Sequence, residues 1–173
     1  MSRFLQARKL APLLVTWEVG QAVVQQSEVA ARQDGAKFIE AEHMLLALAS
    51  DPESDAARLL SESGVDHERL AAALRDERQR TLAFAGFKVA EQRPPEVTEV
   101  ESPLSLGTSA KAAIRRALVG SRHDHRARLR STDLLAGILE AELGTVPRAL
   151  AIAGIDRAEI IARARGQVQR PQC

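Results

Sequence analysis

Two carboxylates and a histidine stand directly before an apolar run, and they are the first residues of this chain that could do chemistry. Glu40, Glu42 and His43 precede Met44 and the run through Leu48. Carboxylates in the first turn of a helix interact favourably with the positive end of the helix dipole. A carboxylate there can also accept a guanidinium group from a ligand. Both interpretations stay open for Glu42, and we expect His43 to pack in the core or to cap the helix.

The other candidates for catalysis or metal binding are isolated. His123-Asp124-His125 places two histidines one residue apart in an arginine-rich segment, without further ligands at the spacing that zinc sites use. Cys173 is the single cysteine and stands in a tail that we expect to fray. No Gly-x-x-x-x-Gly-Lys-Ser/Thr loop for nucleotide phosphates occurs. We therefore predict a protein that is not an enzyme and that binds no metal or cofactor.

Basic residues gather in one segment, although the chain is nearly neutral. The formal net charge is +1 at pH 7, while residues 111–130 carry seven cations against Asp124 alone, a local balance of 7 − 1 = +6. The seven cations are Lys111, Arg115, Arg116, Arg122, Arg126, Arg128 and Arg130. Such a segment is typical of a solvated surface, and the alternative is a patch for an anionic partner. A helical DNA-binding regulator ranks low, because the overall charge is close to zero.

The composition favours a helical globular protein in a reducing compartment. Of the 173 residues, 45% are hydrophobic, 27% charged and 3% aromatic, with alanine, leucine, arginine and glutamate abundant. These residues favour helix over sheet. A single cysteine allows no internal disulfide, which fits the cytoplasm. The apolar run at residues 10–15 is too short for a signal peptide, and nothing approaches the ~20 apolar residues of a membrane span, so we expect no membrane contact.

The spacing of apolar residues and the residues that end helices predict eight helices. The first four occupy residues 16–34, 41–50, 53–63 and 66–80, and the last four begin near residues 108, 131, 145 and 156. We expect an N-terminal arm (1–15), a linker rich in Pro and Gly (81–107) and a frayed tail (166–173). A short hairpin from Thr81 to Val89 is an alternative for part of the linker. Thr108 or Ser109, and Ser131, are the expected N-caps of the fifth and sixth helices.

The two halves of the chain repeat with a period of 90 residues. Residues 39–48 align with 129–138, and Gly64-Val65-Asp66 aligns with Gly154-Ile155-Asp156 (129 − 39 = 154 − 64 = 90). In these junctions glycine ends one helix, the apolar residue enters the core and aspartate starts the next helix. The match predicts an all-α fold of two pseudo-symmetric four-helix repeats, residues 16–80 and 108–165, which form a single domain.

Each half resembles the Clp repeat at the N-terminus of Clp unfoldases of the ClpC and ClpA type. The first copy has Glu42-His43 before its apolar run, the second has Thr132-Asp133, and each has the glycine junction. The resemblance covers about residues 16–165. The copies depart from the family pattern at Ala41, where threonine is usual, and at Thr132-Asp133, where the Glu-His pair is replaced. The ATPase modules of the family have no counterpart, so we expect a stand-alone N-domain built of two Clp repeats.

This resemblance implies a module that binds peptides, adaptor proteins or substrates. In some relatives the glutamate of the Glu-His pair binds phosphorylated arginine, and Glu42 carries that residue over here. Other relatives receive cyclic peptide antibiotics in a groove between the repeats, near their first helices, and isolated relatives can act as decoys. We therefore expect a sensor or decoy linked to Clp proteolysis. The alternative is an accessory subunit or adaptor that contacts a Clp ATPase.

Six residues are predicted to contact a ligand in that groove. They are expected to line it or to carry its polar groups, and they are Leu13, Trp17, Glu42, Leu106, Lys111 and Thr132. An ordinary core position is the other interpretation of Trp17. Two aromatic residues of the linker, Phe84 and Phe87, are predicted to be exposed.

Overall fold

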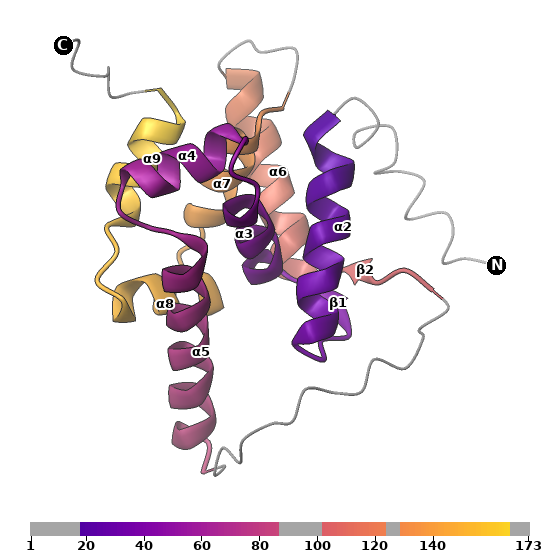
Figure 1. Cartoon of the computed structure of the whole chain (residues 1–173), viewed down its shortest axis with the longest axis vertical. Coiled ribbons are helices and arrows are strands. Elements are labelled where there is room, and N and C mark those ends of the chain that lie inside the picture. Colours follow the sequence, from indigo (N-terminus) through magenta and orange to yellow (C-terminus); the bar gives the residue numbers. More distant parts are fainter. Residues whose placement is uncertain (1–17, 87–101, 124–128, 167–173) are drawn as a thin grey trace.

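The structure is a computed structural model that describes residues 18–86, 102–123 and 129–166 (Figure 1). Leu13, Trp17 and Phe87 lie outside these residues, as does most of His123-Asp124-His125. The described residues form eight α-helices and one pair of very short strands. The predicted all-α fold of eight helices is therefore confirmed.

The helices of the two halves begin at matching positions. The first repeat contains α2 (Glu18–Gln33), α3 (Ala41–Ser50), α4 (Asp55–Glu62) and α5 (His67–Phe84). The second contains α6 (Thr108–His123), α7 (Ser131–Leu139), α8 (Thr145–Ile152) and α9 (Arg157–Ala164). The differences 108 − 18, 131 − 41, 145 − 55 and 157 − 67 are all 90. The 90-residue period thus relates the starts of α3, α4 and α5 to those of α7, α8 and α9, and residue 18 is where the described part of α2 begins.

The glycine junctions have the geometry that the sequence predicts. The glycines of Gly64-Val65-Asp66 and Gly154-Ile155-Asp156 have φ angles of 70° and 64°, in the left-handed region that glycine enters without a steric cost. The apolar residues are 2% and 8% exposed. Both aspartates accept hydrogen bonds from backbone N–H groups of the helix that follows. Each junction therefore ends one helix, fills the core and starts the next helix.

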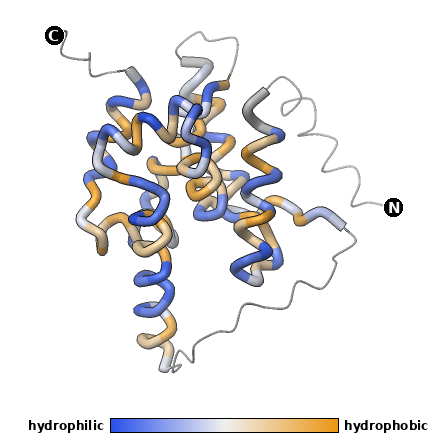
Figure 2. Tube along the Cα trace, viewed as in Figure 1, coloured by the Kyte–Doolittle hydropathy of each residue, from blue (hydrophilic) through white to orange (hydrophobic). Residues whose placement is uncertain are grey.

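Helices α3 and α7 form the centre of the molecule (Figure 1). All nine residues of α7 are buried, and so are six of the ten residues of α3. In Figure 2 these two segments are largely apolar, whereas the surrounding helices alternate between apolar and polar residues. Gly137 of α7 allows close contact with α6, because a Cβ there would lie 2.5 Å from the Ala113 carbonyl oxygen. The core therefore spans both repeats, which form one packed unit.

A two-residue strand pair also joins the repeats. The strands β1 (Phe38–Ile39) and β2 (Ser105–Leu106) are parallel, with Phe38 opposite Ser105 and Ile39 opposite Leu106. The N–H of Gly107 donates to the Ile39 carbonyl oxygen (2.8 Å) and extends the pairing. The pair lies directly before α3 and α6, so it brings the starts of these two helices together.

The predicted N-caps at the starts of α6 and α7 are wrong. Arg130 is the N-cap of α7, and Ser131 is its first residue. The Ser131 hydroxyl accepts a hydrogen bond from the Ala56 N–H at the start of α4 (3.2 Å). Helix α6 begins at Thr108, so both candidate caps lie inside it. The serines retain a capping function, but each serves a helix that is distant in sequence.

The linker prediction also needs a correction. Helix α5 continues to Phe84, so the hairpin proposed from Thr81 to Val89 is wrong where the structure describes it. The Thr81 hydroxyl donates to Glu77 one turn earlier (2.8 Å), and no proline interrupts this segment. The lower end of α5 extends beyond the other helices in Figure 1. Phe84, at that end, is 96% exposed, as predicted.

Candidate functional site

A hollow of about 420 Å³ opens between the two repeats. Its walls come from the start of α3, the first half of α6, and the loop and first turn that lead into α8. We call it the inter-repeat hollow. Its lining residues are Glu40, Ala41, Glu42, Thr108, Ser109, Ala112, Arg116, Ala141, Leu143, Gly144, Thr145, Val146 and Pro147.

The starts of α3 and α6 cap each other beside this hollow. Glu40 Oε2 accepts hydrogen bonds from the Ser109 N–H (2.9 Å) and hydroxyl (2.5 Å), and that hydroxyl accepts one from the Ala41 N–H (2.8 Å). Gly107 makes room for the carboxylate, because a Cβ at that position would lie 1.9 Å from Glu40 Oε1. This Glu40–Ser109 joint fastens one repeat to the other and fixes the backbone at the edge of the hollow.

Glu42 is the acid of the hollow that is available to a ligand. It is half-buried in the first turn of α3, and it forms no hydrogen bond or ion pair with the described part of the chain. The neighbouring Glu40 carboxylate is occupied by Ser109. Because a partly desolvated carboxylate forms strong charge-assisted hydrogen bonds, Glu42 is suited to a guanidinium or ammonium group.

Three helix starts, those of α3, α6 and α8, meet at the same hollow. The dipole and any unbonded N–H groups at a helix start favour an anion, but at α3 and α6 the Ala41 and Ser109 N–H groups are already bonded within the Glu40–Ser109 joint. At α8 the N-cap is Gly144, which has no side chain to accept from these groups, and Pro147 has no N–H of its own. The hollow therefore combines a carboxylate suited to a cation with backbone donors suited to an anion.

One wall of the hollow is apolar. Leu143, in the loop between α7 and α8, is 90% exposed and presents an apolar side chain to the hollow. Val146 and Pro147 continue this wall into α8. On the α6 side, Arg116 Nε donates to the Gly137 carbonyl oxygen (2.7 Å), which holds this side chain against α7. An organic ligand would thus meet an apolar surface next to the charged groups.

His43 holds the start of α3 from inside the protein. It is 1% exposed, and its Nδ1 accepts a hydrogen bond from the Glu40 N–H (2.9 Å). Its Nε2 lies 3.5 Å from Asp34 Oδ2, which also accepts a hydrogen bond from Arg78 of α5 (2.8 Å). His43 and Arg78 hold the pKa of Asp34 below its ordinary value, and partial burial opposes them. His43 therefore both packs in the core and caps the helix, as predicted.

The four predicted ligand residues that the structure describes do not line one site together. Glu42 lines the inter-repeat hollow, whereas Lys111 is exposed on α6 and is not among the lining residues. Thr132 is 7% exposed in α7, and its hydroxyl has no hydrogen-bond partner among the residues that the structure describes. Leu106 is half-buried in β2 and packs against the core. The remaining two lie outside the described residues.

Sequence reasoning missed the α7–α8 loop and the roles of Ser109 and Arg116. Ser109 was assigned to its own helix, although its hydroxyl serves the start of α3. Arg116 was counted only as part of a basic segment, although it is half-buried and bound to α7. The loop did carry one signal, because Leu143 is a large apolar residue between Glu142 and Gly144.

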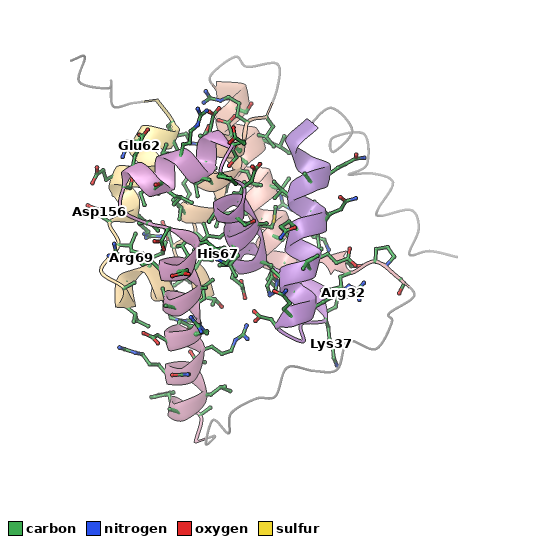
Figure 3. All side chains as sticks on the ribbon, viewed as in Figure 1. Arg32, Lys37, Glu62, His67, Arg69 and Asp156 are labelled. Atoms are coloured by element: carbon green, nitrogen blue, oxygen red, sulfur yellow. The ribbon has the colours of Figure 1, made fainter. Side chains whose placement is uncertain are left out.

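A second hollow, of about 450 Å³, lies over α4 and the start of α5. Its rim includes Glu62 and His67, which Figure 3 labels. Glu62 is bound to Arg163 of α9, and the adjacent Arg69 donates to the carbonyl oxygen of Gly64 (2.8 Å). Because these charged groups already have partners, the inter-repeat hollow is the stronger candidate site.

No helix in the described residues is long and apolar enough to cross a membrane. Within the same residues, no three potential ligand side chains of His, Cys, Asp or Glu come together as a metal site would require.

Comparison with known proteins gives a family and a fold. Residues 18–153 match the family model described as the Clp repeat (R) N-terminal domain. The N-terminal domain of the caseinolytic-protease-associated chaperone ClpD from Arabidopsis thaliana is similar, with a TM-score of 0.64 and 17% identity over 89% of this chain and 95% of that one. A structure from investigations of a malarial protein secretion system has a TM-score of 0.57 and 17% identity over 84% and 88% of the two chains. A search of curated proteins found no match.

Proposed function

Because the chain belongs to the family of Clp repeat N-terminal domains, we propose that it is a non-catalytic module that binds a ligand in the inter-repeat hollow. The proposed role is that of a sensor or decoy for ligands of the Clp proteolytic machinery. The ligand class is a peptide or protein segment that carries a phosphorylated arginine.

The observation that carries this proposal is the position of Glu42. Its carboxylate has no partner among the described residues, and it stands beside three helix starts. Phosphoarginine carries a guanidinium and a phosphoryl group on one side chain. The guanidinium suits a carboxylate, and the phosphoryl oxygens suit helix N–H donors. The Glu42 carboxylate thus complements the guanidinium of this ligand, and the N–H donors at the helix start complement its phosphoryl group.

The test is a calorimetric titration with phosphoarginine, compared with free arginine and inorganic phosphate. We expect phosphoarginine to bind more tightly than either part alone. The Glu42→Gln variant keeps the size of the side chain and removes its charge, so it should weaken binding roughly tenfold or more, since a hydrogen bond to a charged group contributes about 1.5–3 kcal/mol.

Glu68→Gln is the matched control. Glu68 is also an acid in the first turn of a helix, but it is exposed on α5 and does not line the hollow. This variant should bind as the unmodified protein does. Absence of phosphoarginine binding would refute the proposed ligand, and equal binding by Glu42→Gln would refute the role of Glu42.

A cyclic or linear peptide without phosphate is the second candidate ligand, and the apolar wall at Leu143 favours it. Leu143→Ser should weaken the binding of such a peptide, whereas Glu42→Gln should change it little. The other candidate role is that of an accessory subunit or adaptor. Stable recovery of a Clp ATPase with the protein from cell extract would favour that role over the sensor.

A further inference from the structure

Arg116 of α6 is fixed beside the inter-repeat hollow by one of its three guanidinium nitrogens. Its Nε donates to the Gly137 carbonyl oxygen at 2.7 Å. This carbonyl lies near the end of α7, and the Ala141 N–H, which would reach it if the helix continued, donates to the Ile138 carbonyl oxygen instead (3.3 Å). The hydrogen bond from Arg116 therefore serves a helix carbonyl and sets the position of the guanidinium before any ligand binds.

The two terminal nitrogens of Arg116 are available to a ligand. Within the described residues they form no hydrogen bond or ion pair, and they do not belong to the buried side-chain atoms that lack a partner, so both reach solvent. Arg116 and Glu42 line the same hollow, but the described part of the chain contains no ion pair between them. A guanidinium and a carboxylate thus line one cavity, and each can bind a ligand group of opposite charge.

The equivalent surface of the other repeat carries neither of these charges. The residue 90 positions before Arg116 is Gln26, and the residue 90 positions after Glu42 is Thr132 (116 − 26 = 132 − 42 = 90). Gln26 is exposed, whereas Thr132 is buried. The pair of opposite charges is therefore specific to the inter-repeat hollow and does not follow from the helices that the two repeats share.

The helix starts at the two surfaces differ as well. The hydroxyls of Ser54 and Ser131 accept hydrogen bonds from backbone N–H groups in the first turn of α4 (3.1 and 3.2 Å). The residues at the equivalent positions beside α8, 90 residues away, are Gly144 and Ala41, and neither has a side-chain acceptor. In the hollow, no serine at these two positions competes with an anion for the N–H groups of α8.

We propose that Arg116 determines the specificity of the hollow by binding the phosphoryl group of the ligand, while Glu42 binds the guanidinium. Its two terminal nitrogens can donate together to one phosphoryl group, which is the geometry in which arginine binds phosphate most strongly. Because Nε is already bonded to Gly137, the side chain loses less conformational entropy when a ligand binds. This inference rests on the function proposed above and adds to it the residue that distinguishes phosphoarginine from arginine.

The test compares arginine with phosphoarginine by nuclear magnetic resonance titration of the ¹⁵N-labelled protein, which also measures weak binding. In Arg116→Gln the dissociation constant for phosphoarginine should rise about tenfold or more, whereas that for arginine should change less than about twofold. The selectivity for phosphoarginine should therefore fall about tenfold. Glu42→Gln should instead weaken the binding of both ligands, because both carry the guanidinium.

Arg115→Gln is the matched control. Arg115 is the neighbouring residue of α6 and carries the same charge, but it is exposed and does not line the hollow. This variant should bind both ligands as the unmodified protein does. If Arg116 only supported the fold through Gly137, its replacement would weaken arginine and phosphoarginine equally. Such an equal loss, or an unchanged selectivity, would overturn the proposal.

Inorganic phosphate tests the anion site without a variant and without a guanidinium in the ligand. Its addition to the unmodified protein should shift the Nε–H signal of Arg116 and leave that of Arg115 unchanged. Equal shifts at both arginines, or no shift at Arg116, would contradict the proposal. If phosphoarginine does not bind, the proposed ligand fails, and the phosphate titration alone then decides whether Arg116 binds anions.

Discussion

The contact between α6 and α7 allows a stability prediction at Gly137. A Cβ added there would lie 2.5 Å from the Ala113 carbonyl oxygen and 2.7 Å from the Ala117 nitrogen. Both are backbone atoms and cannot rotate away. An ordinary contact needs at least 3.4 Å, so α6 would have to move by about 3.4 − 2.5 = 0.9 Å at this point. Gly137→Ala should therefore separate two helices of the core.

The magnitude follows from two opposing effects. Alanine favours an internal helical position by about 1 kcal/mol over glycine. Overpacking a core costs about 1–3 kcal/mol, and contact with backbone atoms belongs at the upper end of that range. We expect a net loss of about 1–2 kcal/mol in the free energy of unfolding. For a chain of this length, that corresponds to a fall in Tm of about 2–8 °C.

Urea denaturation followed by circular dichroism at 222 nm measures this change, and Gly120→Ala is the control. The three atoms nearest to a Cβ at Gly120 of α6 would all belong to the Arg165 guanidinium, which is the far end of a side chain and not backbone. Its gain in helix propensity should offset a weakened pair between Arg165 and Glu140, leaving stability within about 1 kcal/mol. If Gly137→Ala were as stable as the unmodified protein, the argument from close helix packing would be wrong.

The remaining predictions concern ion pairs. Asp34→Asn should destabilise the protein at pH 7, because a carboxyl whose folded pKa is lowered contributes stability above its unfolded pKa of about 3.9. The difference should close as the pH falls through the folded pKa, and a difference that persists at pH 2 in denaturation curves would contradict this cause. Arg148→Ala should cost about 1–2 kcal/mol in urea denaturation, because it leaves the buried Glu77 carboxylate with Thr81 alone. Arg58→Ala, which breaks an exposed pair, should cost less than about 0.5 kcal/mol, and equal losses in the two variants would show that burial of the acid is not decisive.

The parts of the fold that the sequence predicted depend on local chemistry. The 90-residue period is carried by helix-ending glycines, N-capping aspartates and apolar runs, and each of these acts within a few residues of its own position. Gly64 and Gly154 adopt the left-handed conformation, and Asp66 and Asp156 cap the next helix, as their types require. Local signals therefore sufficed to locate the helices.

The errors at the N-caps arise where one side chain serves a helix that is distant in sequence. Ser131 and Ser109 have the residue type of an N-cap, and each does accept from the N–H of a helix start. The helices that they serve are 131 − 56 = 75 and 109 − 41 = 68 residues away. A local pattern does not contain the position of such a partner. For the same reason, the hollow could be predicted between the repeats, but its α7–α8 wall could not.

The two repeats have the same arrangement of helices, but the polar side chains at their helix starts differ. Between α3 and α6 the Glu40 carboxylate accepts hydrogen bonds from Ser109, and the Ser109 hydroxyl accepts one from the Ala41 N–H at the start of α3. The residues 90 positions away are Arg130 and Val19. Arginine has no acceptor and valine has no hydroxyl, so this pair cannot form the same joint. The core tolerates these differences in polar residues at its edge, because apolar packing depends on side-chain volume and on the exclusion of water. The two copies are thus alike in the core and differ at the polar edge that could recognise a ligand.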